Sequence, residues 1–111
     1  MYKIGIYNKL IDNIELLNGC NRIFEINDFD RLKNFIRKED TLITCSAFTL
    51  YGIELLELLE IKENFNLTIK CVSDINIDTS SSTGNMCFQT NMIILKTIKD
   101  NSEIIKKILN F

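Results

Sequence analysis

The sequence has 111 residues, of which 46% are hydrophobic and 25% charged, with a formal net charge of −2 and a pI of about 5.1. This length and balance fit one domain with a continuous core and exclude a disordered tail. The absence of histidine and the wide spacing of the four cysteines exclude the common zinc-site patterns and histidine-assisted chemistry, so we expect no metal and no cofactor. The acidic total also argues against a domain that grips DNA phosphates by itself.

We expect four short strands, at residues 2–7, 20–25, 40–45 and 66–72. The segment 40–45 is a compact apolar run typical of a buried parallel strand, and the segment 66–72 alternates between apolar and polar residues. Helical spacing of apolar residues predicts a short piece up to Leu17, a helix that follows Asp28 as N-cap, and a largely buried helix over residues 50–59. Strands that alternate with helices in this way predict an α/β fold. We therefore expect a single domain over residues 1–111, a three-layer α/β/α arrangement around a mainly parallel sheet of four to five strands.

The last segment, residues 84–111, predicts either one long helix or two helices broken near Asp100, Asn101 and Ser102. A serine- and threonine-rich stretch, residues 80–83, precedes it and is suited to cap its first turn. The apolar residues of the segment occupy more than one face of the helix, so we expect part of them to pack against a partner. This expected dimer interface comprises Met86, Phe88, Met92, Ile94, Leu95 and Ile98.

Residues 77–89, Ile-Asp-Thr-Ser-Ser-Ser-Thr-Gly-Asn-Met-Cys-Phe-Gln, resemble the stretch that leads into the long helix of the serine recombinases, the resolvases and invertases. Residues 18–25 and 37–43 resemble the second and third strands of their catalytic domain, in the same order along the chain. The three blocks are spread over residues 18–89, which is most of the length of the sequence. It implies a resolvase-like fold and a relation to DNA strand exchange, site-specific recombination and mobile elements.

The chemistry of that family is attack on a DNA phosphodiester by a serine hydroxyl, with arginines that neutralise the phosphate. The position of the nucleophilic serine corresponds to Ile11, which has no heteroatom in its side chain. The arginine-bearing motif corresponds to residues 48–53, where Phe48, Thr49 and Gly52 stand and only Leu50 agrees with the family. We therefore expect no catalytic residues and no enzymatic activity. No helix-turn-helix region accompanies the domain, so sequence-specific DNA recognition is not expected either.

Two functions are favoured from the sequence, and a third, residual DNA strand cleavage through another hydroxyl such as Ser46 or one of residues 80–82, stays open. The first is a catalytically inactive, recombinase-like module that forms a homodimer, or a heterodimer with a recombinase, through its terminal helix. The alternative is weak, non-specific DNA binding through Lys96, Lys99 and Lys106 of that helix, although a solvated polar face is the simpler interpretation of these lysines. No apolar run reaches the roughly 20 residues that span a bilayer, and the start of the chain has no signal-peptide pattern, so we expect a cytoplasmic protein without membrane contact.

Overall fold

A computed structural model describes residues 1–109 of the chain. Its centre is a four-stranded sheet of β1 (Lys3–Tyr7), β2 (Arg22–Glu25), β3 (Thr41–Thr44) and β4 (Thr68–Cys71), in the order β2-β1-β3-β4. All three strand pairs are parallel. The predicted α/β fold with a parallel sheet is therefore confirmed, and within residues 1–109 the number of strands is four.

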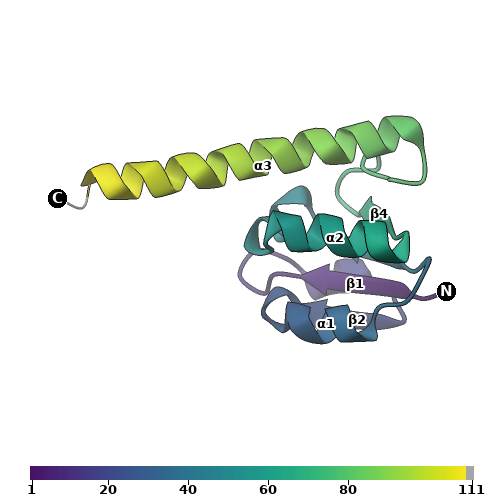
Figure 1. The fold of residues 1–111 in the computed structure, drawn as a ribbon. Helices are drawn as coiled ribbons and strands as arrows, with labels where there is room; N and C mark the ends of the chain where they lie inside the picture. The colour runs from purple at the N-terminus through teal and green to yellow at the C-terminus, as the bar shows by residue number, and fades with distance from the viewer. Residues whose placement is uncertain (110–111) are drawn as a thin grey trace.

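One face of the sheet carries the main core. Ile4, Leu42 and Ile69 are paired neighbours on adjacent strands and are fully buried. They join one apolar cluster with residues of α1 (Phe29–Phe35), α2 (Leu55–Phe65) and the first half of α3 (Ser82–Leu109). Figure 1 shows α2 between α1 and α3, so the three helices cover this side of the molecule.

The opposite face is covered by a much smaller element, the 3₁₀ helix η1 (Ile14–Leu17). Leu17 is buried there, and a Cβ added to Gly5 of β1 would lie 3.0 Å from its Cδ1 atom and 3.1 Å from Cys20 Sγ. Glycine in β1 thus allows this short segment to approach the sheet closely. The two layers that flank the sheet are consequently unequal.

Two helical boundaries differ from the sequence prediction. Asp28 precedes α1 but its side chain makes no capping hydrogen bond, because residues 26–28 already form the 3₁₀ helix η2 (Ile26–Asp28). The predicted helix over residues 50–59 is two elements, the 3₁₀ helix η3 (Ala47–Gly52) and α2. Ser46 and Thr49 form a capping box that starts η3 early, and Glu54 then caps α2 separately.

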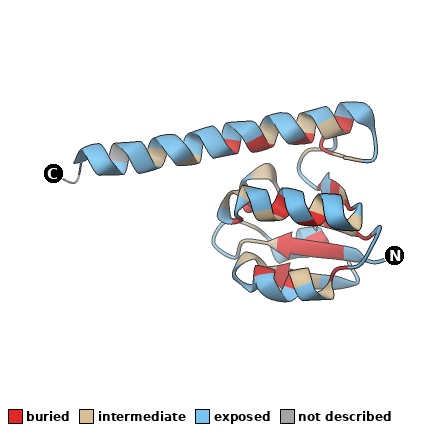
Figure 2. Ribbon diagram, viewed as in Figure 1, coloured by how far each residue is buried: buried red, intermediate tan, exposed pale blue. Residues whose placement is uncertain are grey.

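The terminal segment forms one helix of 28 residues, so Asp100, Asn101 and Ser102 do not interrupt it. Its first half packs against the body, whereas its second half extends past the body into solvent (Figure 1). Figure 2 shows the same division, with buried positions confined to the half of α3 nearest the sheet. None of the helices within residues 1–109 is long and apolar enough to cross a membrane.

Candidate functional site

The carboxyl ends of parallel strands are the usual place for a ligand or active site in an α/β fold, at the point where the strand order reverses. Here that point lies between β1 and β3, where the loop after β1 meets η3. The Thr49 hydroxyl donates to the Asp12 carboxylate over 2.7 Å, so the two segments that we compared with the recombinase catalytic motifs lie together. Ile11, which precedes Asp12, and Phe48, which precedes Thr49, are exposed to solvent.

The polar groups at this edge of the sheet bond to one another and to the backbone. Asp12 also accepts from the Asn8 amide over 2.8 Å, Ser46 accepts from the Thr49 amide, and the Thr44 hydroxyl donates to the Ser46 carbonyl over 2.6 Å. Thr49 is entirely buried, which denies a substrate access to its hydroxyl. This network joins two loops and caps η3.

Cys45 lies at the same edge of the sheet, and its thiol is a poor nucleophile. Cys45 is buried, and its burial, followed by the negative charge of Asp12, raises its thiol pKa to about 11. Because the thiolate is the nucleophile, a thiol with this pKa is inert near neutral pH. Among the described residues, moreover, no three cysteine or carboxylate side chains converge as a metal site would need.

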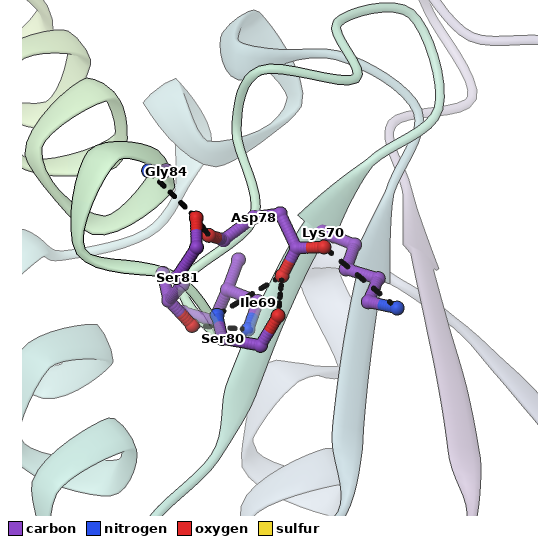
Figure 3. A network of polar contacts seen from close by, with 7 residues as sticks. Ile69, Lys70, Asp78, Ser80, Ser81 and Gly84 are labelled. Atoms are coloured by element: carbon purple, nitrogen blue, oxygen red, sulfur yellow. Dashed lines mark hydrogen bonds and ion pairs between the residues drawn. The ribbon is translucent and has the colours of Figure 1, made fainter.

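The segment with the most specific resemblance, residues 77–89, anchors the start of α3 (Figure 3). Thr79 is held to β4 by its hydroxyl, which accepts from the Ile69 amide over 2.8 Å, and by its own amide, which donates to the Ile69 carbonyl. Asp78 accepts from the Ser80 amide and hydroxyl, and these hydrogen bonds, ahead of the nearby Lys70, lower the pKa of its carboxyl group. The loop is thereby tied to the edge strand of the sheet.

The helix cap itself comes from Ser81, whose Oγ accepts from the Gly84 amide over 3.0 Å, as the serine-rich stretch predicted (Figure 3). A Cβ on Gly84 would lie 1.9 Å from the Asp78 carbonyl oxygen, so only glycine permits this close approach of helix and loop. The segment therefore has a structural role: it sets the direction in which α3 leaves the sheet.

The residues expected to form a dimer interface fall into two groups. Phe88, Met92 and Leu95 belong to the core cluster of the chain itself and are buried there, so they are not on the surface that a partner would meet. Met86, Ile94 and Ile98 are exposed. Periodicity alone did not separate the groups, because both consist of apolar residues on one helix and only the position of the sheet distinguishes them.

The second half of α3 is strongly amphipathic. At 100° per residue, its six charged residues between 94 and 109 lie within an arc of about 120°. The uncharged residues of this half, apart from Leu95 and Ser102, occupy an arc of about 140° on the opposite side. This arc faces away from the body-facing stripe, which consists of Phe88, Met92 and Leu95. Its exposed apolar side chains include three that the sequence prediction did not name, Ile104, Ile108 and Leu109.

The expected DNA-binding lysines share the charged side of α3 but alternate with acids. Lys96 donates to Asp100 over 2.9 Å, and Lys99 Nζ lies 5.8 Å from the centre of the Tyr51 ring. Both line a groove of about 270 Å³ between α3 and the η3–α2 region, together with Glu54 and Glu103. Lys106 is exposed further along the helix. The structure thus places the three lysines on one side without forming a continuous basic patch.

No protein-family model matches the chain, and comparison with curated proteins finds no match either.

Proposed function

We propose that this chain is a non-catalytic, recombinase-like association module that acts through the projecting half of α3. Its partner is a second copy of the chain or an intact recombinase. One observation carries the proposal: between residues 94 and 109 the described apolar side chains other than Leu95 are exposed and lie on the side of the helix that faces away from the chain's own core. An apolar face that the fold itself leaves uncovered is typical of a surface that binds a protein partner.

The carboxyl edge of the sheet supports the non-catalytic part of this proposal. Ile11 stands at the position where the related enzymes place their serine, and Thr49 and Asp12 are engaged in joining two loops. The four free cysteines support a cytoplasmic location, where thiols stay reduced. The three sequence blocks support the relation to serine recombinases, and the parallel sheet with a long terminal helix is compatible with it.

The proposal is tested by measuring mass against concentration, with light scattering or sedimentation equilibrium. The wild-type chain is expected to form dimers as its concentration rises to about 1 mM, the range that detects an association as weak as −4 kcal/mol. The double substitution Ile98→Glu and Ile108→Glu is expected to abolish the dimer, because it places charges in the apolar face. The matched control, Lys106→Glu with Lys107→Glu, changes the charged side and is expected to leave association intact.

Two results together would contradict the proposal: the wild-type chain stays monomeric throughout this range, and it does not bind an intact serine recombinase. Incubation with supercoiled plasmid tests the non-catalytic part separately. We expect neither nicked plasmid nor a covalent protein–DNA adduct.

DNA binding is the second candidate, and the exposed Lys106 and Lys107 favour it. The charged side of the helix carries four lysines, at 96, 99, 106 and 107, against Asp100 and Glu103, which leaves an excess of two positive charges (4 − 2). Few phosphate contacts imply weak binding with a shallow salt dependence. A gel shift at low salt that disappears in Lys106→Gln with Lys107→Gln supports this candidate, and the absence of any shift at low salt removes it.

A further inference from the structure

We infer that the apolar face of α3 pairs with α3 of a second copy, parallel and in register, so that each Asn101 meets the Asn101 of its copy. This inference rests on the proposed function and specifies its partner and geometry. It starts from the spacing of positions 94, 98, 101, 105 and 108, which recur at alternating intervals of four and three residues. A repeat with this spacing averages 3.5 residues and is what two supercoiled helices need at their contact.

The described side chains of this seam are open in the single chain. Ile94, Ile98 and Ile108 are 51%, 45% and 53% exposed, and Asn101 between them is exposed as well. Thr97, Ile104 and Leu109 flank the seam, and all three are uncharged. Since every charged residue of this half lies on the far side of the helix, two copies approach without like charges opposing each other.

Asn101 decides the direction of the partner. In a parallel, in-register pair each seam residue meets its own counterpart, so two Asn101 amides lie side by side and satisfy each other's hydrogen bonds. In the antiparallel pair with the same seam, Asn101 would face Ile98 and Asn91 would face Ile108. That arrangement leaves buried amides against aliphatic side chains, which is costly.

Asn101 also favours a protein partner over a lipid surface. An amide in the middle of an apolar face has no hydrogen-bond partner when that face enters lipid, whereas a second copy supplies one. Among the described residues of the face, in addition, no aromatic side chain is available to anchor it at a membrane interface. The body-facing stripe points well away from the seam, so a parallel partner meets α3 and not the sheet.

Disulfide trapping tests the orientation, in a Cys87→Ser background because Cys87 is the nearest natural thiol on α3. Under mild oxidation, Ile108→Cys is expected to give a disulfide-linked dimer as the main species. In a parallel pair the two introduced thiols meet, and a disulfide requires Cα atoms within about 7 Å. In the antiparallel pair position 108 lies opposite position 91, so the two thiols would be about 25 Å apart. Lys107→Cys, on the charged side, is the matched control and is expected to remain unlinked.

Three results would overturn the inference. The first is a wild-type chain that dimerises by mass while Ile108→Cys stays unlinked, which refutes the orientation and leaves the proposed association intact. The second is a mixture of Ile98→Cys and Asn101→Cys chains in which the mixed 98–101 disulfide forms more readily than the disulfide of either variant with itself, which indicates the antiparallel pair. The third is a chain that stays monomeric by mass yet sediments with anionic phospholipid vesicles, which fails both the inference and the proposed self-association.

Discussion

The two halves of α3 have similar composition and opposite surroundings. The first half buries Phe88, Met92 and Leu95 in the core and Gly84 against the loop at Asp78, whereas no described side chain beyond Leu95 is buried (Figure 2). Both halves contain aliphatic residues at helical spacing, yet one half completes a core and the other presents an uncovered face. The apolar content of a helix therefore does not predict its role unless the elements that pack against it are known.

The largest expected effect separates these halves directly. Phe88→Ala should lower the free energy of unfolding by about 3–5 kcal/mol, because Phe88 is fully buried and its loss leaves a cavity. Ile98→Ala, in the projecting half, should change it by less than about 0.5 kcal/mol when measured on the monomer. Chemical denaturation followed by circular dichroism at low protein concentration compares the two. Equal destabilisation would show that the second half also belongs to the core.

A smaller effect is expected where the first half is anchored. Gly84→Ala should cost about 1–3 kcal/mol, because its Cβ would collide with the Asp78 carbonyl and force the loop away from the helix. Thr83→Ala, at the exposed neighbouring position, is the control and should be nearly neutral. The same denaturation measurement serves both variants. Full stability of Gly84→Ala would mean that α3 can leave the sheet in a different direction.

The loop before α3, which contains Asp78, should also make the stability of the fold depend modestly on pH. The folded state lowers the pKa of Asp78 through the Ser80 hydrogen bonds, so this carboxylate stabilises the fold above its unfolded pKa, near 3.8. That contribution is lost as pH falls through the lower, folded pKa. Asp78→Asn should therefore show a flatter decline of stability below about pH 4 than the wild-type chain. Identical acid profiles would exclude the loop as a source of acid sensitivity.

The smallest effect on folding is expected from shortening the helix. A chain that ends after Glu103, the last residue of α3 that lines the groove with α2, should unfold with a free energy within about 0.5 kcal/mol of the full chain as a monomer. It should no longer associate, because part of the apolar seam is gone. Mass measurements and denaturation of the same sample test both statements. A large loss of stability would show that the projecting half supports the body.

The positions of the strands follow from the sequence alone. The four strands coincide, within two residues at each end, with those expected at residues 2–7, 20–25, 40–45 and 66–72. The sequence also predicts the serine cap of α3, since Ser81 directly precedes the helix, at the position from which a side chain caps the first turn. Both signals are local, so no tertiary contact is needed to produce them.

The candidate site depended on contacts between distant parts of the chain. The hydrogen bond between Thr49 and Asp12 joins residues 37 positions apart, and no pattern in the sequence announces it. The division of the expected interface residues also required the sheet, which takes Phe88, Met92 and Leu95 into the core and leaves Ile94 and Ile98 outside. The periodicity of α3 is enough to predict apolar residues on more than one side of the helix. Which side is covered follows from the fold, because burial depends on what packs against a residue as well as on its own chemistry.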